Sequence, residues 1–361
     1  MRHKKYRYKS DWMSRQMDEQ LGLLEDRLTT LYANASFEVN AEFGKFAKTF
    51  SDKDLEMLAK LEAGSITEAD YIQWRRVNIL ETDLYKSTLD SITGLMVNTD
   101  IAAMAIVNGD LPYVVAQSYN FVQSLGFKAA DDAGLSVGTF QIYNAKSVEE
   151  IIKKNPALLP SVNVSEDKKW NQTKINNQIT NSIVKGDSIP KVAENLQQVA
   201  KMDENTAIRS ARTAMTAAEN MGRAESASKL KEMGIPIDEV WSATLDERTR
   251  DTHLLLDGTK KDENGVFGAD ILNIPLRYPA DPLGEPSEIY NCRCRTNVVL
   301  QGIDHSQDEE LYAQFMSEQA PKEWEKLQES KSYIQKMDIE RRTKDYQTVL
   351  KEITSKGYYL P

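Results

Sequence analysis

Glycine, proline, cysteine and histidine are all scarce in this sequence of 361 residues, with 17, 11, 2 and 3 copies respectively. Few glycines and prolines leave little material for turns, while frequent alanine, glutamate, lysine, leucine and glutamine favour helix. The 40% hydrophobic content is enough for a substantial core, and a chain of this length forms about two or three domains. We therefore expect a mainly α-helical protein.

Long apolar runs are also absent. No stretch reaches the roughly 18 apolar residues that span a bilayer, and the longest candidate is the short segment 101–107. No apolar segment typical of a secretory signal follows the basic N-terminus, so we expect folding in a cytoplasm and no membrane partner. Cys292 and Cys294 are one residue apart. This spacing is too short for an unstrained disulfide, and reduced thiols are expected.

The charge is divided unevenly along the chain. The net charge is −10, but residues 1–15 carry six basic side chains against Asp11 alone. An acidic body argues against non-specific coating of nucleic acid, whereas this basic arm is suited to contact phosphates or an acidic protein surface. A solvated terminus is the alternative. The candidate contact residues in the arm are Arg2, Lys4, Lys5, Arg7 and Lys9.

The first part of the chain has helical periodicity. Apolar residues recur at steps of three and four from Met13 to Phe50, which predicts one long amphipathic helix. Shorter helices are predicted over 52–61, 67–80 and 84–97, and a loop or small irregular module between Asn108 and Gly138. We place a domain boundary near residue 165. The prediction is a coiled-coil-like helical domain over 1–165 that includes the basic arm 1–15.

The next part combines helices with strands. Helices are predicted from Trp170 to Ile183, from Ser188 to Val199, and from Asp203 to about Gly234. Residues 240–244 alternate like a strand, and 297–300 are the expected partner strand. The complete prediction is a mainly α fold: an elongated N-terminal helical bundle over 1–165, a small α+β module over 166–300, and a helical C-terminal tail over 301–361.

Three arginines of the helix predicted from Asp203 suggest a docking contact. Arg209 and Arg212 lie three residues apart and are therefore neighbours on the helix surface. We expect these two residues and Arg223 to dock the helix onto the acidic segment 246–247, with phosphate binding as the alternative.

Both cysteines and one of the histidines, His253, fall between Trp241 and Val299, which makes this segment the candidate site. In extended chain, alternate side chains share a face, so Cys292 and Cys294 could bind one ion with His253, and Asp257 as the fourth ligand. Structural zinc usually has a second closely spaced ligand pair, which is missing here. We expect no cofactor, with zinc at these residues as one alternative and small buried thiols beside a hydrogen-bonded histidine as the other.

Two catalytic interpretations also stay open. A cysteine nucleophile would need His253 as its base and a carboxylate that orients the ring, for which the candidates are Asp246, Asp251 and Asp257. No local protease signature accompanies it. A ribonuclease-like site would use His253 as acid or base and an arginine to hold a phosphate, for which the candidates are Arg248, Arg250 and Arg277. Ion pairs and turn contacts at a sheet edge are the alternative for Arg248 and Arg250.

Three groups of residues occur in a fixed order along the chain. The groups are Arg209, Arg212, Thr213, Asn220 and Gly222; then Trp241, Asp246, Arg248, Thr249, His253, Asp257 and Gly258; and finally Asn291, Cys292 and Cys294. Together they resemble the phage head-morphogenesis family, also called minor head or Mu F-like proteins. The resemblance covers about residues 170–300.

This resemblance implies a non-enzymatic, structural minor head protein of a tailed phage or prophage. Such a protein acts in procapsid assembly through the portal, with scaffold or major capsid protein as further partners. It belongs in the host cytoplasm during assembly and then inside the virion head, where the basic arm could meet packaged DNA. No small-molecule substrate is expected. The alternative is a barnase-like nuclease or toxin-type module centred on His253, with Arg248 and Arg250.

Two positions depart from the family pattern. Relatives often have glutamate after the Arg-Thr pair, where this chain has Ala214, and often have His-Pro before the Asn-Cys-Arg-Cys motif, where it has Ile289 and Tyr290. The loss of a carboxylate and a histidine argues against general acid–base chemistry. It leaves the structural role unaffected.

Overall fold

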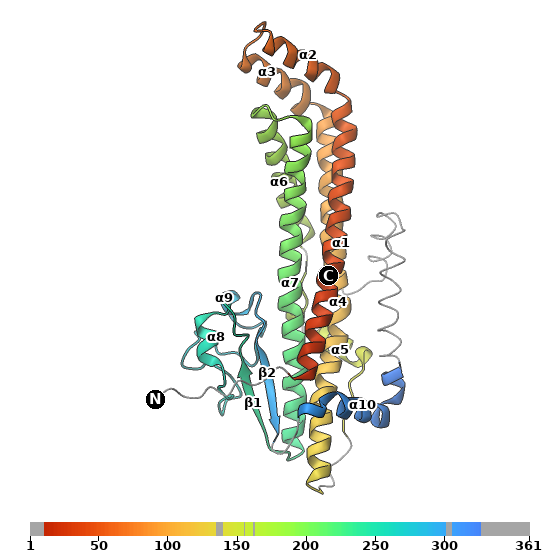
Figure 1. Ribbon diagram of the computed structural model, residues 1–361, viewed down its shortest axis with the longest axis vertical. Helices are drawn as coiled ribbons and strands as arrows, with labels where there is room; N and C mark the ends of the chain where they lie inside the picture. The colour runs from red at the N-terminus through yellow and green to blue at the C-terminus, as the bar shows by residue number, and fades with distance from the viewer. Residues whose placement is uncertain (1–10, 135–139, 155, 162, 301–304, 326–361) are drawn as a thin grey trace. The chain divides into compact units, whose positions relative to one another are not determined.

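The computed structural model describes residues 11–134, 140–154, 156–161, 163–300 and 305–325 (Figure 1). These residues are mainly helical, with one two-stranded antiparallel sheet, which confirms the predicted fold class. The longer elements are α1 (Trp12–Lys48), α2 (Ser51–Glu62), α3 (Glu68–Arg75), α4 (Asp83–Asp132), α5 (Ala145–Lys154), α6 (Val164–Val184), α7 (Ile189–Glu232) and α10 (Asp308–Gln319). The sheet region contains β1 (Ile237–Ser242), α8 (Asp251–Leu256), α9 (Pro286–Ile289) and β2 (Arg295–Leu300). Single turns of π or 3₁₀ helix lie at Arg76–Leu80, Pro156–Leu158 and His305–Gln307.

The chain forms two compact units, each built from separate segments. Unit 1 contains residues 1–25, 106–160 and 209–344, and unit 2 contains residues 26–105, 161–208 and 345–361. Helices α1, α4 and α7 contribute residues to both units. The division at residues 165 and 300 follows chain order and stays a prediction. The five basic arm residues from Arg2 to Lys9 lie outside the described residues, as does the tail beyond residue 325.

Helix α1 confirms the helix predicted from Met13 to Phe50. Its buried side chains follow the predicted steps of three and four and include Met17, Leu24, Leu28 and Val39. The helix ends at Lys48, two residues before the predicted end. The apolar stripe alone was sufficient to predict this element because it places a large side chain in the core on each successive turn or two.

The prediction of a loop between Asn108 and Gly138 is wrong, because α4 continues as one helix to Asp132 with Pro112 inside it. The residues around the proline, among them Leu111, Val114 and Val115, are buried, so tertiary packing overrides the local helix breakers. Among the described residues, α4 is the one helix with the length and composition of a membrane span. Within its apolar stretch of 18 residues, 78% is buried inside the protein. This helix therefore uses its apolar side chains within the protein.

The two helices predicted on either side of residue 201 form a single helix, α7. Asp203, predicted to begin the second helix, instead lies inside α7 and is buried, with its carboxylate 3.3 Å from Lys174 Nζ. In unit 1, α7 approaches α4 closely at Gly222, where a Cβ atom would lie 2.5 Å from the Val115 carbonyl oxygen. The glycine at this position therefore allows the two helices to pack closely.

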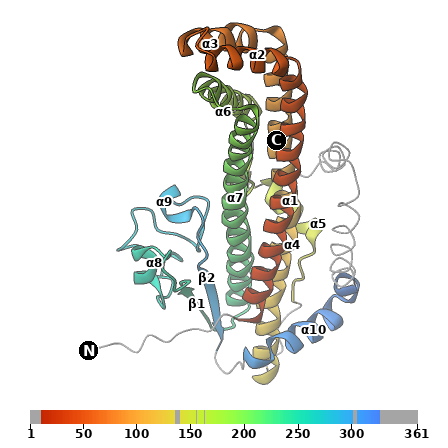
Figure 2. The ribbon, with the colours of Figure 1, turned by 45° about the horizontal axis from the view of Figure 1, so that its top comes forward.

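The predicted strand pair is also confirmed. Strands β1 and β2 pair antiparallel, with Trp241 opposite Thr296 and Val240 opposite Asn297. The two strands lie side by side, and α8 and α9 belong to the long connection between them (Figure 2). This connection carries most of the candidate site.

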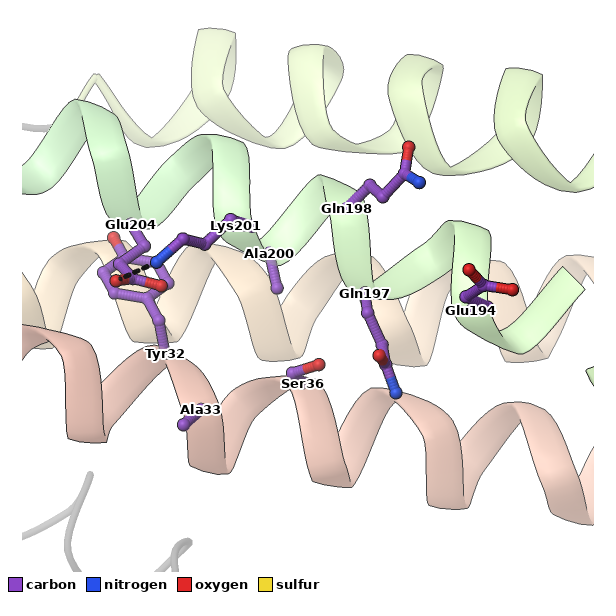
Figure 3. Close-up of a pocket in the computed structure, with 9 residues that line it drawn as sticks. All are labelled: Tyr32, Ala33, Ser36, Glu194, Gln197, Gln198, Ala200, Lys201 and Glu204. Atoms are coloured by element: carbon purple, nitrogen blue, oxygen red, sulfur yellow. Dashed lines mark hydrogen bonds and ion pairs between the residues drawn. The ribbon is translucent and has the colours of Figure 1, made fainter. Parts of the chain in front are cut away.

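Unit 2 contains a groove and a buried acidic cluster. The groove, of about 430 Å³, is bordered by α1 and α7, and within its lining Lys201 pairs with Glu204 at 2.6 Å (Figure 3). It includes none of the motif residues. In the cluster, the Tyr32 hydroxyl donates to Asp100 (2.5 Å), and the Asn171 amide donates to both Asp100 (3.1 Å) and Asp167 (3.4 Å). Burial is the main reason that the pKa of Asp100 rises to about 8.

Replacement of Asp100 by asparagine should stabilise the protein in a pH-dependent way. The pKa of Asp100 is about 8 in the folded protein and about 3.9 in an unfolded chain. Between these two pH values the folded state keeps a proton that the unfolded state has released. The wild-type free energy of unfolding therefore falls as the pH rises from about 4 to 8. We expect Asp100→Asn to raise it by about 1 kcal/mol or more at pH 8, and by much less at pH 5.

Urea denaturation at the two pH values measures this difference. The matched control is Asp90→Asn, which makes the same change at an exposed carboxylate of the same helix. A difference between wild type and Asp100→Asn that is equal at pH 5 and pH 8 would contradict a raised pKa at Asp100.

Candidate metal centre

Polar side chains on one face of α7 hold the backbone that carries the two cysteines. The Thr213 hydroxyl accepts a hydrogen bond from the Asn291 N–H (2.8 Å), and the Thr216 hydroxyl donates to the Cys292 carbonyl (2.9 Å). Thr213 and Thr216 are three residues apart and so lie on the same helix face. The start of the Asn-Cys-Arg-Cys segment is thus fixed to the helix.

Asn220, one turn further along the same face, holds the end of that segment. Its buried amide donates to the carbonyls of Cys294 (3.1 Å) and Pro279 (3.2 Å), and its oxygen accepts from the Thr296 N–H (2.7 Å). The Asn220 side chain is fully buried, and each of these backbone groups would lose its partner if the amide were removed. Asn220 therefore joins the helix to the first residues of β2.

The Asn-Cys-Arg-Cys segment directs its side chains to two sides. Asn291 has a φ of 56°, a left-handed conformation that asparagine tolerates better than most residues. The guanidinium of Arg293 binds the Asp246 carboxylate through two contacts of 2.5 and 2.8 Å. Cys292 and Cys294, by contrast, are both buried and face His253.

His253, from α8, completes a buried cluster with the two thiols. Its Nδ1 lies 3.7 Å from Cys292 Sγ and 3.4 Å from Cys294 Sγ. His253 is 1% exposed and each cysteine 2% exposed. The three potential ligand atoms all lie within 4.8 Å of one another, so one metal ion could contact all of them.

The other ring nitrogen of His253 faces a carboxylate. Nε2 lies 3.2 Å from Glu288 Oε2, and Glu288 belongs to α9. The Thr252 hydroxyl donates to the same carboxylate oxygen at 2.9 Å, which fixes its position. Nε2 and this carboxylate are close, but they form no hydrogen bond in this arrangement.

The two thiols differ in acidity. The hydrogen bond from the Cys292 thiol, followed by the neighbouring His253, lowers the pKa of Cys294 to about 5 despite its burial. That same hydrogen bond and burial raise the pKa of Cys292 well above its usual value. The neighbouring thiol and imidazole therefore make Cys294 the more acidic of the two thiols.

The first strand and the turn after α8 form the wall of the cluster. The buried Trp241 ring meets the His253 ring edge-on, with centroids 5.1 Å apart, and the Trp241 carbonyl accepts from the Gly258 N–H at 2.8 Å. Gly258 has a φ of 77°, which requires glycine or a strained residue. Asp257, predicted as a fourth ligand, lies outside the cluster, and its Oδ1 accepts from the Ala243 N–H at 3.0 Å.

The geometry gives the catalytic interpretations no support. The His253 ring is buried between the thiols and Glu288, so it does not present a nitrogen to an external substrate. Arg250 donates to the Tyr290 carbonyl at 2.6 Å, and Arg248 is exposed, 3.8 Å from Asp246. Arg250 therefore makes a turn contact and Arg248 lies beside an acidic residue, as the structural alternative for these arginines describes.

The predicted docking of the α7 arginines onto segment 246–247 is wrong for Arg212 and Arg223. Arg212 binds the Glu25 carboxylate at 2.5 and 2.9 Å, whereas Asp246 is occupied by Arg293. Arg223 is 0% exposed and is paired with Asp11 (2.7 Å) and Glu219 (3.0 Å). A buried guanidinium requires such partners, and Asp11, directly before α1, is one of them.

The oppositely charged side chains around Arg223 stabilise one another in their charged forms. Burial raises the pKa of Asp11, but the Arg223 guanidinium outweighs burial and holds this pKa well below its usual range. Glu219 also accepts hydrogen bonds of 3.1 Å from Arg295 on β2. The start of α1, helix α7 and strand β2 therefore share one buried ionic network.

Two residues of the site, Thr216 and Glu288, were not predicted from the sequence. Thr216 lies between Thr213 and Asn220 at helical spacing, and this spacing is a signal that could have identified it. Glu288 offers no comparable signal, because its role depends on the fold of the long connection that carries α9. The motif residues Arg209 and Gly222 lie on α7 outside the cluster itself.

A long helix, a two-stranded sheet and short connecting helices around a buried His–Cys–Cys cluster define a small α+β module. Residues 173–297 match the family described as Phage Mu protein F like protein. The match confirms the resemblance that the ordered motif residues indicated for this part of the chain. It supports a phage head-related role for the protein.

A curated relative matches part of the chain. It is the NAD(+)–arginine ADP-ribosyltransferase EFV of Enterococcus faecalis (strain ATCC 700802 / V583), which is 31% identical over 144 residues. The match covers 40% of this chain and 29% of the relative, so the chain spans less than a third of that protein's length. No solved structure matches the chain significantly.

Replacement of Asn220 by alanine should destabilise the protein strongly. The change leaves the Thr296 N–H and the Cys294 carbonyl without the partner that Asn220 supplies, and we expect a cost of about 3 kcal/mol in the free energy of unfolding. The matched control is Asn205→Ala, at an exposed asparagine of the same helix, with an expected effect within about 0.5 kcal/mol. Chemical denaturation of both variants measures the effect, and equal costs would show that Asn220 does not hold the segment.

Proposed function

We propose that this protein is a structural minor head protein of a tailed phage or prophage. It acts in procapsid assembly through contact with the portal, with scaffold or major capsid protein as further partners, and is carried inside the head. The observation that carries this proposal is the match of residues 173–297 to the Mu F-like family. The contacts of the motif residues in the structure support it.

Several motif side chains hold other parts of the same module. Thr213 and Asn220 bind the backbone of the cysteine segment, and Asp257 binds the backbone of Ala243. Trp241 packs against the His253 ring. Residues with these contacts set the shape of a rigid module, which is what an assembly component must present to its partners.

An enzymatic role has weaker support. The relative from Enterococcus faecalis is named as an ADP-ribosyltransferase, but the match extends over only 29% of that protein. We therefore do not assign the activity in its name to this chain. His253, the acid or base of the nuclease alternative, is buried and therefore not accessible to an external substrate.

Isolated heads test the proposal directly. In cells that produce the phage encoding this chain, we expect the protein in purified procapsids and in full heads at a fixed ratio to the portal, measured by quantitative mass spectrometry. It should also co-purify with a tagged portal protein. Because the protein is carried inside, external protease should leave it intact until the heads are opened.

A tail protein in the same preparation serves as the control for protease activity, since it is accessible from outside. Absence of the protein from both procapsids and full heads would overturn the proposal. Digestion of the protein while the capsid stays closed would overturn its internal location.

The basic arm is the proposed contact with packaged DNA. Replacement of Arg2, Lys4, Lys5, Arg7 and Lys9 by glutamine removes five positive charges. Because each phosphate contact releases counterions, we expect the slope of log affinity against log salt to fall in magnitude by up to roughly 4, with at least about a tenfold loss of affinity for duplex DNA at low salt. Fluorescence anisotropy with labelled duplex DNA measures both quantities.

A control variant changes the net charge by the same amount elsewhere. It replaces the exposed lysines Lys48, Lys53, Lys168, Lys169 and Lys185 by glutamine. An equal loss of affinity in the two variants would show that the arm makes no specific contribution. A wild-type protein that does not bind duplex DNA even at low salt would remove DNA from the set of partners.

A further inference from the structure

We propose that His253, Cys292 and Cys294 bind one zinc ion, which has a structural role in the module. The three side chains come from two separate places, α8 and the residues just before β2. Each is at most 2% exposed, and their ligand atoms lie within 4.8 Å of one another. This inference does not rest on the proposed role in the phage head.

The distances between the ligand atoms fit a tetrahedral zinc ion. Zinc binds sulfur at about 2.3 Å and nitrogen at about 2.05 Å, so a tetrahedral angle places the two atoms about 3.6 Å apart. The Nδ1 atom of His253 lies 3.4 Å from Cys294 Sγ and 3.7 Å from Cys292 Sγ. An ion could therefore bind between these three atoms with little movement of the side chains.

The surroundings of the ligands have the features of a zinc site. Zinc-binding histidines usually donate their second ring N–H to a carboxylate. The Glu288 carboxylate lies 3.2 Å from Nε2 of His253, close enough for such a bond after a small reorientation, although the two form no hydrogen bond in this arrangement. A thiolate ligand also needs hydrogen-bond donors, and the Thr244 backbone donates to Cys294. Imidazole and thiolates are ligands that favour zinc over magnesium or calcium.

Three protein ligands leave one position of a tetrahedral ion for water or another small ligand. Asp257 does not supply it, because its Oδ1 is bound to the Ala243 N–H. Substitution of either cysteine or of His253 should therefore reduce metal binding, whereas substitution of Asp257 should not. A variant of Asp257 is thus a matched control.

The local fold explains why a metal would stabilise this region. The connection from β1 to β2 contains only two short helices, α8 at six residues and α9 at four. Helices of this length are not stable alone, and long irregular connections have a high conformational entropy when unfolded. A zinc ion bound to α8 and to the residues before β2 would fix the two ends of this connection to each other.

Metal analysis of the full chain tests the proposal. Protein purified without chelator and under reducing conditions should contain about one equivalent of zinc per chain by elemental mass spectrometry. The double variant Cys292→Ser/Cys294→Ser should contain less than about one tenth of an equivalent. Asp257→Asn, which keeps an acceptor for Ala243, should retain the wild-type content.

A second measurement works even where a cysteine variant fails to fold. Wild-type protein is unfolded with chelator, then refolded with cobalt(II) in place of zinc. Two thiolate ligands give a thiolate-to-cobalt charge-transfer absorption, and refolding without any metal should lower the Tm of the module.

The outcomes are distinct. Wild-type protein with no zinc, no cobalt charge-transfer absorption and an unchanged Tm would overturn the proposal. Zinc that persists in the double cysteine variant would place the ion elsewhere and would also overturn it. Zinc lost equally in Asp257→Asn and the cysteine variant would show that the three proposed ligands are not the determining set.

Discussion

The hydrogen bonds between the polar face of α7 and the backbone of residues 291–296 are the constraint on which the module depends. A buried backbone group without a partner costs about 1–3 kcal/mol, and here the partners are side chains of Thr213, Thr216 and Asn220. These contacts position β2 for pairing with β1 and turn both cysteines toward α8. The candidate metal centre follows from that placement.

A second constraint comes from buried charge. Arg223 is completely buried and binds Asp11, which lies outside the segment that matches the Mu F-like family, residues 173–297. Arg295 likewise binds Asp18 of α1 at 2.5 Å. The family segment is therefore completed by carboxylates from the start of the chain. The sequence motifs give no indication of this dependence, because the two parts are far apart in the sequence.

The parts of the fold that could be predicted have a strong local signal. The stripe from Met13 to Phe50 predicted α1, and alternation predicted both strands. The continuity of α4 through Pro112 and of α7 through Asp203 could not be predicted locally, because burial of their neighbours decides it. At the site, ligand chemistry identified His253, Cys292 and Cys294, whereas the contact of Glu288 with His253 depends on tertiary structure.

We expect the motif residues to form one cooperative structural unit, and hydrogen exchange of the full chain tests this expectation most directly. If the unit is cooperative, peptides that cover residues 289–297 exchange as slowly as the part of α7 around Asn220, because their amides are released only when the module unfolds. Rapid exchange of residues 289–297 while that part of α7 stays protected would contradict the claim. It would show that the cysteine segment detaches from the helix on its own.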